Sequence, residues 1–242
     1  MKILAIDSSA SAASAAIVED GKILGECYTN TRLTHSQTLM PMVQGVLECA
    51  RVPLESIDLF AVSAGPGSFT GVRIGVASVK GLAMAQEKPC AGVSTLEAMA
   101  RNLAHLDGII CAVMDARCSQ VYNALFEARN GKLNRLTEDR ALAIAALAEE
   151  LQEYGQKPVF LVGDGAKLCY NEEKIKALGA ILPPEPFLYQ RAWGVAEAAK
   201  DLFQRKETLT AAALAPVYLR LPQAERELKK RQAASARPES ES

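Results

Sequence analysis

The sequence contains few histidines, few aromatic residues and almost no net charge. Its two histidines, His35 and His105, lie far apart and form no H-x-x-x-H or H-E-x-x-H motif, which disfavours a zinc hydrolase. Aromatic residues make up 5% of the 242 residues, and the formal net charge is −1. The chain therefore has few rings to stack on bases and no positive field to attract a polyanion, so we expect weak direct binding to nucleic acid.

Long apolar runs and closely paired cysteines are also absent. No stretch of about 18 apolar residues predicts a membrane-spanning helix. The start of the chain, MKILAIDSS, enters a strand pattern without the basic and apolar regions of a secretory signal. The six cysteines form no C-x-x-C pair and lie in or beside apolar segments, as small buried hydrophobic residues do. We therefore expect a cytoplasmic protein with reduced cysteines and no membrane association.

Hydrophobic residues make up 49% of the chain, and their order predicts an α/β fold that occurs twice. Residues 2–24 and 109–133 each contain an apolar strand ending in Asp, a polar turn, a second strand, a Gly-Lys turn and a third strand. We therefore predict two lobes that face each other across a cleft, an amino-terminal lobe at 1–105 and a carboxyl-terminal lobe at 106–222. The charged segment 223–242 has too few apolar residues to fold alone, and we expect it to be largely disordered.

A glycine-rich segment, VSAGPGSFTGVRIG at residues 62–75, joins a predicted strand to a predicted helix at 70–86. It matches neither the G-x-x-x-x-G-K-[ST] nor the G-x-G-x-x-G pattern of nucleotide-binding loops. We interpret it as a tight strand-to-helix turn capped by Ser68 or Thr70. Direct phosphate binding is the less favoured alternative, since helix amino termini attract anions.

Two aspartates, Asp7 and Asp115, end corresponding strands of the two halves, where a two-lobed ATPase would hold metal-bound phosphates. Such an ATPase has Asp-x-Gly there, because glycine lets backbone amides approach the phosphates. In this sequence Ser-Ser-Ala follows Asp7, and Ala-Arg-Cys follows Asp115. We interpret both aspartates as turn-forming residues, and we expect no catalytic residue and no cofactor or metal bound by this chain alone.

Small residues recur along one side of the predicted helix 70–86. They are Gly71, Gly75, Ser78 and Gly81 or Leu82. A glycine inside a helix costs about 1 kcal/mol relative to alanine, so we expect another backbone to approach this side closely. That backbone belongs either to a neighbouring helix of the same lobe or to a partner chain, with the amphipathic helix predicted at 39–50 lying alongside.

The segments ILAIDSS, THSQTLMP, AVSAGPGSFTGVRIG, VMDAR and PVYLR together resemble the TsaB family, also called YeaZ, from the first residue to about residue 220. The resemblance implies the duplicated actin-like fold of the ASKHA superfamily, which is ribonuclease H-like. It implies a non-catalytic subunit that dimerises with TsaD and recruits the ATPase TsaE. This complex transfers a threonylcarbamoyl group to the adenosine next to the anticodon of tRNAs that read codons starting with A.

The resemblance also has implications for partners and cofactors. ATP and metal are expected on the partner subunits, tRNA is expected to be contacted indirectly through the complex, and a homodimer is expected when the chain is alone. The alternative function is a stand-alone ASKHA-type ATPase or a peptidase-like hydrolase. The absence of phosphate-loop glycines and of clustered metal ligands favours the non-catalytic scaffold.

The family's dimer surface uses the two helices that follow the HSQ and GPGSFTG motifs, which offers a reason for the small residues described above. The partner-interface residues implied here are His35, Leu39, Met42, Val43, Val46, Gly71, Arg73, Gly75, Ser78, Val79 and Leu82. We accordingly expect Gly75→Leu to block association with little loss of fold stability, because leucine is the better helix former.

Overall fold

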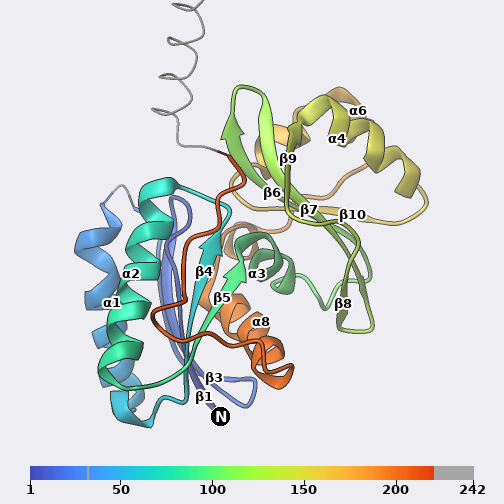
Figure 1. The fold of residues 1–242 in the computed structure, drawn as a ribbon. Coiled ribbons are helices and arrows are strands. Elements are labelled where there is room, and N and C mark those ends of the chain that lie inside the picture. The colour runs from blue at the N-terminus through green and yellow to red at the C-terminus, as the bar shows by residue number, and fades with distance from the viewer. Residues whose placement is uncertain (32, 221–242) are drawn as a thin grey trace, which may run out of the picture.

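Figure 1 shows a computed structural model of the chain, in which two β-sheets are each accompanied by helices. The structure describes residues 1–31 and 33–220. The tail predicted at 223–242 lies outside the described residues.

The first sheet has five strands in the order β3-β2-β1-β4-β5. The strands are β1 (Lys2–Asp7), β2 (Ala13–Glu19), β3 (Lys22–Thr29), β4 (Leu59–Gly65) and β5 (Cys90–Ser94). Strands β1, β2 and β3 are antiparallel neighbours, whereas β4 and β5 continue the sheet in parallel with β1. Successive side chains of β1 point to opposite faces of the sheet, and both faces are covered. A strand buried on both sides reads as a continuous apolar run, as the KILAID segment does.

Helices cover both faces of this sheet (Figure 1). On one face lie α1 (His35–Ala50) and α2 (Phe69–Ala85), which pack on Leu4 and Ile6 of β1. A short 3₁₀ helix, η1 (Leu54–Ser56), precedes β4. The other face is covered by α8 (Ala192–Gln204), with α3 (Thr95–Arg101) packed beside it.

The second sheet repeats the first in strand order. It contains β6 (Gly108–Arg117), β7 (Gln120–Arg129), β8 (Lys132–Arg135), β9 (Arg140–Ala143) and β10 (Val159–Val162). The path β10-β6-β7-β8 corresponds to β4-β1-β2-β3, and β9 also pairs with β7. The remaining helices are α4 (Ile144–Leu151), η2 (Gln152–Tyr154), α5 (Ala166–Tyr170), α6 (Glu173–Ala177) and α7 (Glu185–Leu188). The predicted α/β fold and its duplication are confirmed, because the second sheet repeats the strand path of the first.

The end of the described chain returns to the first sheet. Helix α8 places Ala192, Ala196 and Ala199 against the sheet, where the small side chains let the helix pack closely. Residues 205–220 then run along the same lobe: Leu209 bridges Cys90 of β5. Residues from α8 onward, predicted as part of the carboxyl-terminal lobe, thus pack on the amino-terminal sheet, while the lobe boundaries themselves stay a prediction.

Candidate functional site

Helices α1 and α2 contain all the predicted interface residues, but most of these face the lobe's own core. The apolar ones that are buried against the first sheet are Leu39, Met42, Val43, Val46 and Val79. Their helical spacing reflects the packing of α1 and α2 on β1, β2 and β4. The prediction that these five side chains offer a surface to a partner is therefore corrected: they are internal to this lobe.

The glycines near the start of α2 also meet their own lobe. A Cβ atom on Gly71 would collide with the carbonyl oxygen of Ser8, in the loop after β1. A Cβ atom on Gly75 would lie 2.6 Å from Ser8 Oγ and 3.1 Å from Val62 Cγ2. Ser8 Oγ in turn donates a hydrogen bond to the carbonyl oxygen of Gly71 at 2.9 Å. The interpretation of these two glycines as room for another subunit is wrong, since the loop after β1 fills that room.

The other predicted interface residues lie nearer the surface. Arg73 is exposed, whereas His35, Ser78 and Leu82 are half-buried. His35 Nε2 lies 2.6 Å from the carbonyl oxygen of Ala10, which ties the start of α1 to the loop after β1. Of the predicted interface residues on α2, Arg73 is therefore the exposed one, and Ser78 and Leu82 are partly accessible.

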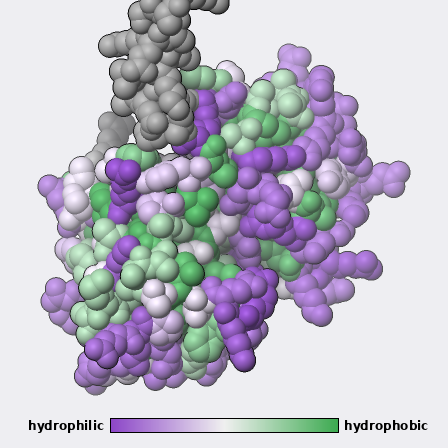
Figure 2. Space-filling model, in the orientation of Figure 1, coloured by the Kyte–Doolittle hydropathy of each residue, from purple (hydrophilic) through white to green (hydrophobic). Residues whose placement is uncertain are grey.

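The outer side of the two helices carries residues that sequence reasoning missed. We define the outer helical face as Met40, Pro41 and Gln44 of α1 with Arg73, Ala77, Gly81 and Met84 of α2, all of them exposed. Figure 2 shows green and pale surface over this part of the molecule. The sequence did contain a signal for these residues. In a helix that packs on a sheet, the positions between the buried ones must point away from the sheet.

Arg73 is held in place at the edge of this face. Its guanidinium carbon lies 3.8 Å from the centre of the Phe69 ring, and Nε donates a hydrogen bond to the Tyr218 hydroxyl at 2.7 Å. The Phe69 and Tyr218 rings are themselves stacked, with centroids 5.0 Å apart. Tyr218 belongs to the PVYLR segment, which therefore ties the end of the described chain to the first turn of α2.

A cleft of about 580 Å³ separates the lobes beside this turn. It is lined by the loops after β1 and β4, by the last residues of β6 and by residues 217–220. The predicted cap on α2 is confirmed, because Ser68 Oγ accepts a hydrogen bond from the backbone N–H of Gly71. A Cβ atom on Gly67 would collide with the carbonyl oxygen of Ser9, so this glycine lets two protein loops approach each other. These contacts support the interpretation of the segment as a structural turn.

The carboxylates of the two strand-end aspartates accept hydrogen bonds from neighbouring groups of the protein. Asp7 is fully buried and accepts hydrogen bonds from Ser63 Oγ at 2.5 Å and from the Ser9 backbone N–H at 2.9 Å. Burial raises the pKa of Asp7 above its ordinary value. Asp115 accepts from the Arg117 backbone N–H at 2.7 Å, as a turn-forming carboxylate does. Within residues 1–31 and 33–220, no group of three or more His, Cys, Asp or Glu side chains could hold a metal ion.

Comparisons with known proteins bear on what this arrangement does. A protein-family model described as "TsaD: tRNA N6-adenosine threonylcarbamoyltransferase" matches residues 29–227. The "tRNA threonylcarbamoyladenosine biosynthesis protein TsaB" of Bacillus subtilis is 34% identical over 227 residues, which cover 93% of this chain and 96% of that protein. The chain belongs to the TsaB (YeaZ) family.

Other members of the TsaB family match over similar lengths. The TsaB protein of Escherichia coli is 34% identical and covers 91% of this chain and 95% of its own length. The solved structure of YeaZ from Pseudomonas aeruginosa has a TM-score of 0.72 at 29% identity, covering 90% of this chain and 99% of that one.

Among the described residues, no helix has the length and apolar character needed to cross a membrane.

A second aspartate lines the cleft beside Asp115, namely Asp164, and sequence reasoning missed it. It follows β10 and lies near Asp115. Burial, with the neighbouring charge of Asp115 as the next cause, raises the pKa of Asp164 to about 6. The folded protein therefore binds a proton on the Asp164 carboxylate more tightly than the unfolded chain does. The stability that this protonation contributes is lost as the pH rises through about 6.

We expect Asp164→Asn to remove this pH dependence. Urea unfolding should show that the variant is more stable than the wild type at pH 8, by up to about 3 kcal/mol, with little difference at pH 4. Glu138 is an exposed carboxylate of the same lobe, so Glu138→Gln serves as the control and should keep the wild-type pH dependence. Equal loss of stability between pH 4 and 8 in the wild type and Asp164→Asn would contradict the assignment.

Proposed function

We propose that this chain is a non-catalytic subunit of a tRNA threonylcarbamoyladenosine synthase complex, in which it binds TsaD. The relatives that match over nearly the whole chain bear the TsaB name, and the matching family model is named for TsaD. The outer helical face is the structural observation that carries the proposal. It presents two neighbouring helices whose exposed residues include Met40, 42% exposed, and Met84, 62% exposed.

Two glycines on these helices support a helical partner. A Cβ atom on Gly45 of α1 or on Gly81 of α2 would meet nothing within 4 Å among the described residues. Neither glycine is therefore explained by packing within the chain, although each costs about 1 kcal/mol of helix stability. The close approach of another subunit's helix accounts for both. Of the glycines predicted to meet a partner, Gly81 thus keeps this interpretation, and Gly45 of α1 joins it.

The same surface is proposed to serve two partners in turn. TsaD would occupy it in the complex, and a second copy of the chain would occupy it when TsaD is absent. The two associations would then compete, and adding TsaD should convert the homodimer into a heterodimer. TsaE, ATP, metal and tRNA are proposed to be bound through the assembled complex or by the partner subunits. Light scattering of the chain with and without TsaD tests this exchange.

The alternative, a stand-alone ASKHA-type ATPase, places its chemistry in the cleft. We expect the isolated chain to hydrolyse ATP no faster than its Asp115→Asn variant does. The Gly71 N–H in the first turn of α2 donates to Ser68 Oγ, and the loop glycine Gly67 lies against Ser9, so both groups contact protein in the place where an ATPase would contact phosphate. A coupled ADP assay with Mg²⁺ measures this. ATP turnover by the wild type that is lost in Asp115→Asn would favour the ATPase over the scaffold.

A further inference from the structure

Within residues 1–31 and 33–220, the chain passes between the two lobes twice, and the two passages touch. Residues 102–107 lead from α3 to β6, and residues 189–191 lead back to α8. Asn102 Nδ2 donates a hydrogen bond to the carbonyl oxygen of Tyr189 at 3.1 Å, which joins the passages. Gln190, in the second passage, is fully buried. This pair of short connections is the place about which one lobe could rotate relative to the other.

Helix α3 lies between the two sheets (Figure 1) and supplies the apolar contact across the lobes. Its Leu96 and Met99 belong to one buried cluster with Ile110 and Phe126 of the second sheet. Apolar burial is strong but non-directional, since it depends on the area removed from water. This contact therefore holds the lobes together, and any further restriction of the angle between them requires directional contacts.

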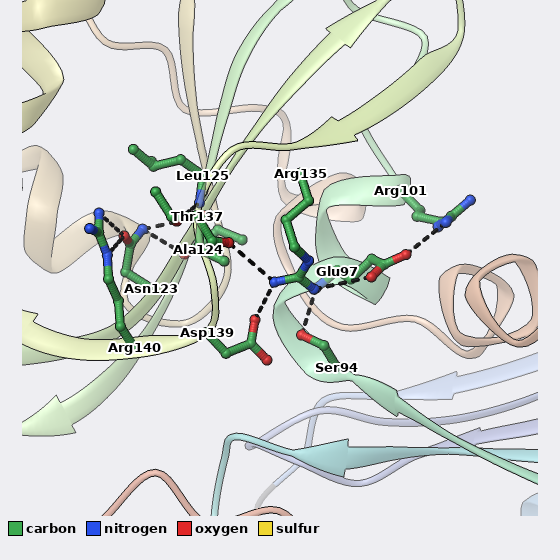
Figure 3. Close-up of polar contacts among 11 residues, drawn as sticks. Ser94, Glu97, Arg101, Asn123, Ala124, Leu125, Arg135, Thr137, Asp139 and Arg140 are labelled. Carbon is green, nitrogen blue, oxygen red and sulfur yellow. Dashed lines mark hydrogen bonds and ion pairs between the residues drawn. The ribbon is translucent and has the colours of Figure 1, made fainter. Parts of the chain in front are cut away.

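A chain of charged side chains crosses the same junction (Figure 3). Glu97 of α3 accepts from Arg135 of β8, with Nη2 and Oε2 3.0 Å apart, and from Arg101 Nη2 at 2.7 Å. Arg135 Nη1 also lies 2.6 Å from Asp139 Oδ1, in the second lobe. Arg101 Nη2 lies 2.6 Å from Asp201 Oδ2, on α8. Alternating charges thus run from α8 through α3 into the second sheet.

These ion pairs differ from ordinary surface pairs in their burial and geometry. Between 17% and 26% of the Glu97, Arg101, Arg135 and Asp139 side chains is exposed, so salt screens them weakly. Burial alone would raise the pKa of Glu97, but Arg101 and Arg135 hold it below its ordinary value. The Arg135 guanidinium also lies 4.7 Å from the centre of the Phe126 ring, within the apolar contact. In some proteins, directional pairs that are shielded from water specify one arrangement among several apolar ones, and the half-buried pairs at this junction have that geometry.

We propose that Asp201, Arg101, Glu97, Arg135 and Asp139 form a lobe latch that fixes the angle between the two lobes and keeps the cleft in one geometry. The decisive bond is the one between Glu97 and Arg135, because it joins α3 to the second sheet. Without it, the apolar contact remains and the lobes sample further angles about residues 102–107 and 189–191. The proposal concerns the shape of this chain and does not depend on which partner it binds.

Two native cysteines allow a direct test. Cys49 on α1 and Cys118 in the turn after β6 are both exposed, one on each lobe. Nitroxide labels on these cysteines, in a Cys27→Ser background, report the distance between the lobes by double electron–electron resonance. The labelled protein is diluted into an excess of unlabelled protein, so that distances between the subunits of a homodimer do not contribute. We then expect a single distance in the wild type, and in Glu97→Gln and Arg135→Gln a second population above about 10%. Glu127→Gln, which breaks the Lys157–Glu127 pair within the second lobe, should keep the wild-type distribution.

Circular dichroism first establishes that each labelled variant is folded. Folded Glu97→Gln and Arg135→Gln proteins with the wild-type distance distribution overturn the proposal. Equal broadening in Glu127→Gln also overturns it, since the broadening would then be independent of the latch. If Glu97→Gln does not fold, Arg135→Gln decides, because this residue lies on a short strand at the edge of the second sheet. Failure of both variants to fold would make the pair a folding determinant and overturn the latch.

Discussion

Ala77→Arg is expected to abolish self-association of the chain and its capture of TsaD. Ala77 is exposed at the middle of α2 on the outer helical face. An arginine there would be buried without a counter-charge when another helix docks, which costs about 3–5 kcal/mol. Association should weaken roughly 100- to 5,000-fold, since each 1.4 kcal/mol is tenfold. The folded monomer should be almost unaffected, because exposed substitutions change stability by about 0.5 kcal/mol or less.

Phe203→Arg is the matched control for this surface. Phe203 is an apolar residue of α8, 40% exposed, and α8 covers the opposite face of the first sheet. The control should associate as the wild type does. Light scattering gives the oligomeric state, and calorimetric titration with TsaD gives the affinity. If Ala77→Arg associates normally and Phe203→Arg does not, the interface lies on the α8 side of the lobe.

Gly71→Ala is expected to destabilise the fold strongly. The added methyl group would collide with the backbone carbonyl of Ser8, which cannot move without displacing the loop after β1. Overpacking against backbone costs about 3 kcal/mol, at the upper end of typical values. For a chain of this size that loss lowers the melting temperature by roughly 6–12 °C. Gly75→Leu should also lower it, contrary to the expectation from the sequence, because Ser8 Oγ and Val62 occupy the same side.

Gly81→Ala, in the same helix, provides the comparison. Nothing in the described chain lies within 4 Å of a Cβ atom at this position, and alanine is the better helix former by about 1 kcal/mol. The monomer should therefore become slightly more stable. Urea unfolding below the association concentration measures both variants. Similar stability changes at Gly71 and Gly81 would show that the contact with Ser8 does not constrain α2.

Much of the fold could be predicted because its signals are local. The continuous apolar run in β1, the Gly-Lys turn between β2 and β3, and the Ser68 cap of α2 each depend on a few neighbouring residues. Their repetition in the second half predicted the second sheet. The return of α8 to the first sheet had no such signal. Its alanine-rich side fits either lobe, and the choice depends on packing between distant segments.

That α1 and α2 bind a partner stays a prediction, but the side chains that the sequence assigned to this surface include several that are buried in the lobe's own core. The spacing of Leu39, Met42 and Val43 shows that one side of α1 is buried, but periodicity contains no information about what buries it. The same ambiguity affected Gly71 and Gly75, whose missing side chains indicate a close approach by an unspecified backbone. The structure identifies that backbone as the loop after β1.

The sequence by itself determined the α/β class, the duplication, the resemblance to TsaB and the two helices of the candidate interface. These properties follow from local propensity, periodicity and motif spacing, which a linear chain displays directly. The tertiary structure alone decided which sides of α1 and α2 face the sheet, which glycines remain open, and how Glu97 joins Arg135 across the lobes. Those features arise from contacts between residues far apart in the chain, and such contacts exist only once the two sheets and α3 have packed together.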